Sequence, residues 1–137
     1  MDRPVRLLFV CHENCNRSQM AEAFARIYGG DFVEPYSAGC CPAGAVHPKA
    51  IAAMQELGYD LQQHFPKALT DLPDIEYDVA VVMCDNGCSG LKARCREDWN
   101  IPVPKSLPPA EFRTVRDLIK DKVRNLLARL SVPLEKE

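Results

Sequence analysis

Apolar and polar positions are grouped along the chain in blocks that predict strands and helices in turn. Short runs rich in β-branched residues, at 5–10 and 77–83, predict buried strands. Segments 32–37 and 99–103 also have strand character, and the prolines within them are typical of edge strands. Four strands are therefore predicted, with the polar segment 84–96 as a loop.

Three further segments carry apolar residues at helical spacing, which predicts helices with one buried face. They are 18–28, 48–58 and 108–130. Ser18 is a suitable N-cap for the first helix, and Pro48 suits the first turn of the second. The order strand, helix, strand, helix, strand, strand, helix predicts an α/β fold with a parallel sheet and helices on both faces. Ligands of such sheets bind beyond the carboxyl ends of the strands.

The composition is that of one globular domain, residues 1–137. Hydrophobic residues make up 47% of the chain and charged residues 26%. The net charge of -2 gives no electrostatic reason to expect a nucleic acid or an anionic membrane as a partner. No apolar run approaches the roughly 20 residues of a membrane-spanning helix, and the first residues are not those of a signal peptide. We therefore expect a cytoplasmic protein.

The chain contains seven cysteines, an odd and large number for a protein of the reducing cytosol. Metal ligands or redox-active thiols explain such a set better than structural disulfides do. Two pairs stand out because each follows a predicted buried strand: Cys11 with Cys15, and Cys84 with Cys88. Since the carboxyl ends of parallel strands lie at one edge of a sheet, we expect the two segments to meet there.

The loop from Cys11 to Arg17 has the features of an anion cradle with a nucleophile at its base. A loop of five residues between a strand and a helix can turn several backbone N–H groups towards one point, and the helix adds its positive end. Arg17 adds a planar, permanently charged group. The same field stabilises a thiolate, so Cys11 is expected to be reactive. The loop has no glycine, and Asn14 is the residue expected to adopt the left-handed conformation. Ser18 is placed to donate a hydrogen bond to the thiolate.

The segment VCHENCNRSQMAEAF, residues 10–24, resembles the active-site loop of the low-molecular-weight protein tyrosine phosphatase superfamily. Within it, RSQMAE at 17–22 is most similar to the thioredoxin-coupled arsenate reductases. The likeness continues at 37–39, 46–51 and 111–117 and so extends over nearly the whole chain. The resemblance implies a four-stranded parallel sheet flanked by helices.

The resemblance also implies roles for individual residues. Cys11 corresponds to the family's nucleophile, and Arg17 with the loop amides corresponds to its oxyanion-binding group. The residues expected to bind the oxyanion or to support the loop are Asn14, Asn16 and Ser18. The expected ligand is arsenate or a phosphate-like oxyanion, with no metal ion and no tightly bound cofactor.

The spacing of Cys84 and Cys88 resembles the resolving pair of the arsenate reductases. The implied reaction is a thiol relay, in which Cys11 attacks arsenate, Cys84 attacks Cys11 and Cys88 attacks Cys84. The resulting disulfide would be reduced by an external thiol reductant of the thioredoxin or glutaredoxin type. Cys95 is an alternative to Cys88, although the Cys88 spacing is the closer match.

One departure from the family concerns the general acid. Family members carry an Asp-Pro pair after the last strand, and Val103 stands here at the position of that aspartate. General acid catalysis typically contributes about 10²–10⁴-fold, so phosphatase activity is expected to be weak. Asp98, Glu111 or water would have to supply the proton.

Two other functions are compatible with these residues. The chain could be a low-molecular-weight phosphatase with slow turnover, or an oxyanion-binding or redox-sensing protein. A zinc site formed by Cys84, Cys88, Cys95 and His64 is a further alternative, although the paired short spacing of structural zinc sites is missing. No role is predicted for the remaining cysteines, Cys15, Cys40 and Cys41.

Overall fold

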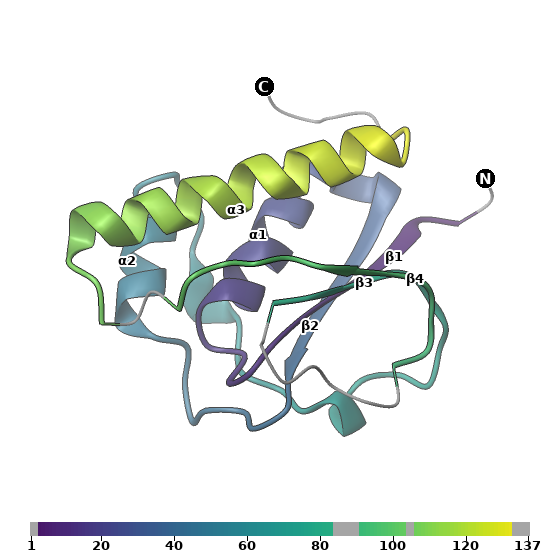
Figure 1. The fold of residues 1–137 in the computed structure, drawn as a ribbon, viewed down its shortest axis with the longest axis horizontal. Helices are drawn as coiled ribbons and strands as arrows, with labels where there is room; N and C mark the ends of the chain where they lie inside the picture. Colours follow the sequence, from purple (N-terminus) through teal and green to yellow (C-terminus); the bar gives the residue numbers. More distant parts are fainter. Residues whose placement is uncertain (1–2, 84–90, 104–105, 133–137) are drawn as a thin grey trace.

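Four parallel strands form the central sheet (Figure 1). The computed structural model describes residues 3–83, 91–103 and 106–132. The strands are β1 (Val5–Cys11), β2 (Val33–Gly39), β3 (Tyr77–Val82) and β4 (Ala93–Asp98). Their order is β2-β1-β3-β4, and every neighbouring pair is parallel. All four carboxyl ends therefore lie at one edge, and the predicted α/β fold with a parallel sheet is confirmed.

The central strand β1 is buried on both faces, which explains its continuous apolar sequence. Because successive side chains of a strand point to opposite faces, Leu7 and Phe9 belong to one core cluster and Leu8 and Val10 to another. The strand ends at Cys11, whose side chain lies on the face of Leu7 and Phe9.

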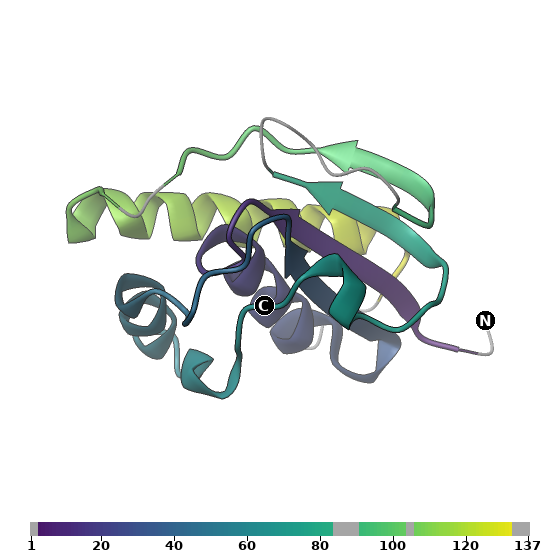
Figure 2. The same cartoon turned by 90° about the horizontal axis from the view of Figure 1, so that it is seen from below.

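The longer helices pack together on the face of Leu7 and Phe9. They are α1 (Arg17–Gly29), α2 (Pro48–Gln55) and α3 (Pro109–Arg129). The described residues also form the short 3-10 helices η1 (Gly30–Phe32), η2 (Leu61–Gln63) and η3 (Leu69–Asp71). α3 lies across α1 on one side of the sheet (Figure 1). η3 and its flanks cover the other face, where Leu69 packs against the cluster of Leu8 and Val10 (Figure 2).

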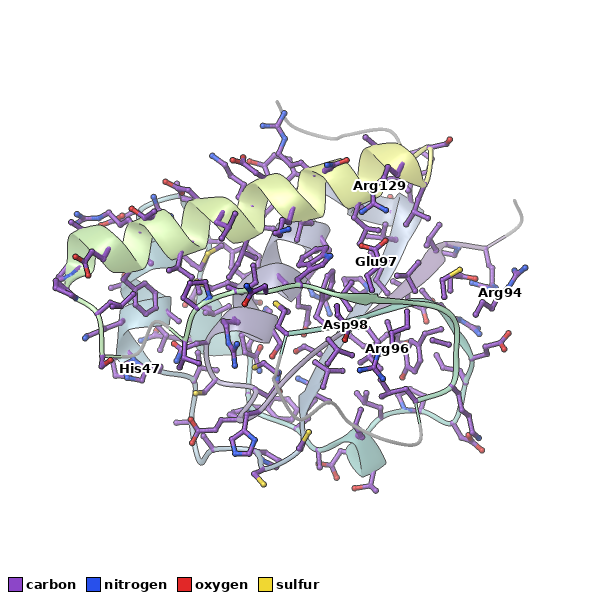
Figure 3. The ribbon with its side chains drawn as sticks, in the orientation of Figure 1. His47, Arg94, Arg96, Glu97, Asp98 and Arg129 are labelled. Carbon is purple, nitrogen blue, oxygen red and sulfur yellow. The ribbon has the colours of Figure 1, made fainter. Side chains whose placement is uncertain are left out.

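The prediction of a strand at 99–103 is wrong, and so is that of a loop extending through residue 96. The fourth strand is β4, whose sequence ARCRED shows no apolar alternation because it forms an edge of the sheet and is largely exposed. The bidentate ion pair of Glu97 with Arg129, at 2.7 and 3.1 Å, joins β4 to α3 (Figure 3). The apolar residues taken for a strand, Trp99 and Ile101, instead follow β4 and are buried in the core.

The other element boundaries differ from the prediction by a few residues. α1 begins at Arg17 with Asn16 as its N-cap, so the assignment of Ser18 as the N-cap is wrong. β2 lies at the edge of the sheet, as Pro35 predicts. In the part of the chain that the structure describes, no helix combines the length and apolar composition needed to cross a bilayer.

Candidate active site

Cys11 and Ser18 face each other across the loop that joins β1 to α1. Cys11 is the last residue of β1 and Ser18 lies in the first turn of α1. Both side chains are buried, and the Cys11 Sγ lies 2.9 Å from the Ser18 Oγ. The first turn of α1 therefore positions the Ser18 hydroxyl within hydrogen-bond distance of the Cys11 sulfur.

Asn14 fixes the direction of the hydrogen bond between Ser18 and Cys11. Its Oδ1 accepts from the backbone N–H of Lys67 at 2.9 Å, and a backbone N–H can only donate, so the Asn14 Nδ2 must face Ser18. The Nδ2 donates to the Ser18 Oγ at 2.7 Å. Because the Ser18 oxygen already accepts from Asn14, its own hydrogen is directed at the Cys11 Sγ. Asn14 has φ 51, so the predicted left-handed conformation is confirmed.

The segment 41–47 runs along the outer side of the loop and binds its carbonyl oxygens. The main-chain bonds are Cys41 N to His12 O at 2.9 Å, Ala43 N to Glu13 O at 2.9 Å and His47 N to Cys15 O at 3.0 Å. In a trans peptide the carbonyl and the following N–H point in opposite directions. The N–H groups after these three carbonyls therefore point away from 41–47, as an anion cradle requires.

Gly39 at the end of β2 lets the loop approach the sheet. A Cβ atom at Gly39 would lie 2.7 Å from the His12 carbonyl oxygen and 2.8 Å from the Asn14 nitrogen. Both are main-chain atoms and cannot swing aside as a side chain can. Gly39 also pairs with Cys11 in the register of β1 and β2. The loop conformation thus depends on a residue without a side chain at this position.

Arg17 is buried and joins the loop to the ends of two other segments. Its Nη1 donates to the carbonyl oxygens of Met83 and, at 3.0 Å, Ile101. Met83 directly follows β3, and Ile101 lies beyond β4. The guanidinium therefore extends along the carboxyl edge of the sheet. Cys84 and Cys88, predicted to follow β3, lie outside the described residues.

The N-cap residue Asn16 does not use its side chain to cap α1. Its Nδ2 donates to the Cys15 Sγ at 3.7 Å, and within the described residues its buried Oδ1 has no hydrogen-bond partner. The Cys15 thiol is also buried and lies 3.9 Å from a carboxylate oxygen of Glu13. The side chains of Asn16 and Cys15 are thus both buried and in contact with each other.

The remaining described cysteines differ in state and position. Cys40 is disulfide-bonded, whereas Cys41 and Cys95 are free and exposed. Cys40 follows Gly39, the register partner of Cys11, and so lies at the same edge of the sheet. The position of Cys40 after a predicted strand could have indicated a thiol at this edge of the sheet.

Cys95 lies well back from the carboxyl edge of the sheet. It pairs with Val79 across β3 and β4, and Val79 pairs with Leu7. Leu7 precedes Cys11 by four residues, a rise of about 13 Å along the strand. Two strand spacings add about 10 Å across the sheet. Because Cα atoms bridged by a disulfide are less than about 7 Å apart, Cys95 is not placed to bond to Cys11.

The candidate general acids lie on exposed parts of the surface. Asp98 ends β4 and pairs with Arg96 at 3.1 Å (Figure 3). In register its Cα lies two strand spacings, about 10 Å, from that of Val10. Val103 is 56% exposed, and Glu111 is exposed in the first turn of α3. Asp98 is therefore the candidate carboxylate that lies on the active-site edge of the sheet itself.

The sequence analysis missed Gln19, which is completely buried and bonded to the loop. Its Nε2 donates at 3.0 Å to both the Oδ1 and the backbone oxygen of Asn14. His64, considered above as a zinc ligand, has both ring nitrogens engaged, with Gln19 and Tyr59. These bonds argue against the zinc site. A buried glutamine directly after Ser18 was the available signal, because such a side chain needs partners.

Comparison with known proteins extends the likeness over nearly the whole chain. A sequence model of the family described as low molecular weight phosphotyrosine protein phosphatase matches residues 6–136. The Glutaredoxin arsenate reductase of Synechocystis sp. is 35% identical over 130 residues, which are 92% of this chain and 98% of that protein. The Arsenate reductase 2 of Staphylococcus haemolyticus is 35% identical over 127 residues, or 90% and 96% of the two chains.

Solved structures of arsenate reductases have the same fold. One in the phosphate binding state has a TM-score of 0.81 and 34% sequence identity, covering 91% of this chain and 98% of its own. The thioredoxin-dependent arsenate reductase of Corynebacterium glutamicum has a TM-score of 0.78 and 26% identity, covering 95% of this chain and 63% of its own.

Proposed function

Because this chain belongs to the low molecular weight phosphotyrosine protein phosphatase family, we propose that it reduces arsenate with Cys11 as the nucleophile. One geometric observation carries the proposal: the buried sulfur of Cys11 receives the hydrogen bond of Ser18, in a loop whose carbonyls are turned outward. The similarity to arsenate reductases, over more than 90% of the chain, supports the choice of substrate.

In the proposed first step the Cys11 thiolate attacks arsenic and a sulfur–arsenic bond forms. One arsenate oxygen leaves as water after taking up protons. The loop N–H groups and the positive end of α1 hold the remaining oxygens. Nη1 of Arg17 is engaged with Met83 and Ile101, so the other guanidinium nitrogen atoms are those we assign to the anion.

The second and third steps transfer two electrons. The Cys84 thiolate attacks the Cys11 sulfur, the sulfur–arsenic bond breaks, and its electron pair stays on arsenic, which leaves as arsenite. Cys88 then attacks Cys84 and releases the Cys11 thiolate. The overall reaction converts arsenate and two thiols into arsenite, one disulfide and water. An external thiol reductant of the thioredoxin or glutaredoxin type reduces the disulfide. We expect the reaction in the cytoplasm, where such reductants keep thiols reduced.

The missing general acid slows ester hydrolysis, and the departure of water from arsenate also needs a proton from Asp98, Glu111 or water. A phosphate ester expels an alkoxide or phenolate that needs a proton, and Val103 cannot supply one. Asp98 is already paired with Arg96 at the surface. We therefore expect any phosphatase activity to be low.

The test is disulfide mapping by mass spectrometry of the fully reduced protein, before and after arsenate is added. We expect a disulfide between Cys84 and Cys88 that appears with arsenate and not with equimolar phosphate or sulfate. In the Cys88→Ser variant the bridge should instead join Cys11 to Cys84. Arsenite release without any new disulfide would contradict the relay.

Two further measurements identify the reductant and test for phosphatase activity. Turnover is measured with thioredoxin and its reductase, and in parallel with glutaredoxin and glutathione, because similar proteins carry either designation. Hydrolysis of p-nitrophenyl phosphate is measured on the same samples. Fast ester hydrolysis that is unchanged in Cys84→Ser would identify a phosphatase instead.

A further inference from the structure

A cavity of about 390 Å³ lies between α1, β2 and the segment that contains η2 and η3. Its volume is in the range of pockets that bind small molecules. The walls come from α1, from β2 and from the segment between residues 59 and 73. No residue of the loop 11–18 lines the cavity, so it is not part of the proposed arsenate site.

Three aromatic side chains from different segments line this cavity. They are Tyr36 of β2, Tyr59 before η2 and Phe65 after it. The two tyrosine hydroxyls are already hydrogen-bonded, to Glu34 and His64, so the rings rather than the hydroxyls are available to a ligand. Phe65 is 65% exposed although it is large and apolar. Because aromatic rings pack well in stacked or edge-on contact, these walls suit a ligand with a flat aromatic body.

The two carboxylates of the cavity and Arg26 already have partners within the protein. Glu22 is bound by Arg26 at 2.9 Å and by Ser37 at 2.6 Å. Asp71 accepts from the backbone N–H of Ala68 at 2.9 Å. The charge of Arg26 is therefore compensated by Glu22, and both carboxylates are in use.

Lys67 also lines the cavity, but it has no ion-pair partner among the described residues. Its Nζ donates to the carbonyl oxygen of Phe65 at 2.9 Å and lies 5.0 Å from the centre of the Phe65 ring. An ammonium group has three N–H donors, so two remain for a ligand. Burial is the largest influence on the pKa of Lys67 and lowers it, so the charged form gains from an anion placed beside it.

We propose that this cavity binds a small aromatic carboxylate, with the ring against the aromatic walls and the carboxylate on the ammonium of Lys67. A neutral aromatic ligand would leave the two Lys67 donors unused. A small inorganic anion would leave the aromatic walls uncovered. A flat ring that carries one carboxylate satisfies both features. The site goes beyond the proposed arsenate chemistry and does not depend on it.

The experiment is calorimetric titration of the full, reduced chain with 1-naphthoate at pH 7. We expect a Kd of about 0.1–1 mM, which is ordinary for a ligand of this size. The neutral analogue 1-naphthalenemethanol has the same ring without the charge. It should bind about tenfold more weakly, because hydrogen bonds between charged groups are stronger than those to a neutral hydroxyl.

The charge of Lys67 is tested by substitution. Lys67→Met should weaken naphthoate binding by about tenfold and leave the binding of the neutral analogue unchanged. Lys67→Arg keeps the charge and should stay within about threefold of the wild type. Lys122→Met is the matched control, because the Lys122 Nζ also lies near an aromatic ring, 5.8 Å from the centre of that of Trp99, and does not line the cavity. It should bind naphthoate as the wild type does.

The aromatic wall is tested with a second pair of variants. Phe65→Ala should weaken the binding of both ligands by about fivefold, since it removes one ring contact. Phe32→Ala is the control, because Phe32 is 49% exposed on η1 and does not line the cavity. Thermal unfolding identifies the variants that fold. If Lys67→Met does not, the two ligands and the phenylalanine pair decide.

Nuclear Overhauser effects between naphthoate and the protein locate the bound ligand. We expect them to the rings of Tyr59 and Phe65. Effects to the amides of residues 12–17 instead would place naphthoate in the anion cradle and overturn the proposal. No binding below about 10 mM would also overturn it, as would equal naphthoate affinities of the wild type and Lys67→Met. Binding needs neither Cys11 nor arsenate, so a protein that binds naphthoate but does not reduce arsenate would refute the function and retain this site.

Discussion

The loop 11–18 and strand β4 are both polar segments of the same sheet, yet their polar groups are held in different ways. Asn14, Arg17 and Ser18 in the loop are buried, and each bonds to main-chain atoms or to another buried side chain. On β4 the charged residues are largely exposed, and the bond of Arg96 to Asp98 joins near neighbours in sequence. The loop is a connected network, whereas β4 is a row of separate surface pairs.

This difference predicts how substitutions act in the two regions. A buried polar group that loses its partner costs about 1–3 kcal/mol, and networks transmit the loss to their neighbours. An exposed ion pair contributes about 0–1 kcal/mol and acts locally. Changes in the loop should therefore alter chemistry and stability together. Changes on β4, apart from the candidate general acid Asp98, should alter stability slightly and leave the chemistry unchanged.

The largest contrast is expected between the two thiols of these regions. Cys11→Ser should reduce arsenate turnover by about 10³-fold or more, because a serine hydroxyl stays protonated where a thiol ionises. Cys95→Ser should change turnover by less than about twofold, because the proposed relay uses Cys88 to attack Cys84 and leaves the exposed Cys95 of β4 without a role. Steady-state kinetics with a fixed reductant measures both.

A large loss in Cys95→Ser would make Cys95 the resolving thiol in place of Cys88. Disulfide mapping of that variant after arsenate then provides the check, because the bridge between Cys84 and Cys88 should still form. Activity remaining in Cys11→Ser would contradict the assignment of the nucleophile.

The next effect tests the contact of the loop with β2. Gly39→Ala should lower the free energy of unfolding by about 1–3 kcal/mol, because the new Cβ would press on main-chain atoms of His12 and Asn14. Gly44→Ala is the matched control, since a Cβ there meets nothing within 4 Å, and it should be neutral or slightly stabilising. Urea unfolding measures both. Equal free energies of unfolding for the two variants would show that the loop can move away from the sheet without loss of stability.

Much of the architecture was predictable because it depends on local patterns. The apolar runs of β1 and β3 and the helical spacing of α1 and α3 reflect burial directly. The left-handed Asn14 followed from a loop that lacks glycine. In these cases one segment carries the whole signal.

β4 and the hydrogen bond between Gln19 and His64 could not be predicted, because each depends on a partner that is distant in the sequence. The sequence of β4 forms a strand because β3 supplies its bonding partner, and its polar side chains remain exposed. His64 is separated from Gln19 by 45 positions, and only the fold brings them together. Such pairings leave no periodic trace in the sequence.

The smallest effect is expected for the ion pair that holds β4 to α3. Arg129 donates to both carboxylate oxygens of Glu97 and lowers its pKa below the ordinary value, with a smaller contribution from the bond of Trp99. A lowered carboxyl pKa stabilises the fold above the ordinary value near 4.5, and this stabilisation is lost as the pH falls through the folded-state pKa. Because Arg129 is about half exposed, we expect a coupling energy of at most about 1 kcal/mol.

A double-mutant cycle of Glu97→Gln and Arg129→Met, followed by urea unfolding at pH 7 and pH 3, measures this coupling energy. The coupling should be present at pH 7 and reduced at pH 3, with arsenate turnover at pH 7 unchanged; an equal coupling at both pH values would mean that hydrogen bonds to a neutral carboxyl hold the edge strand.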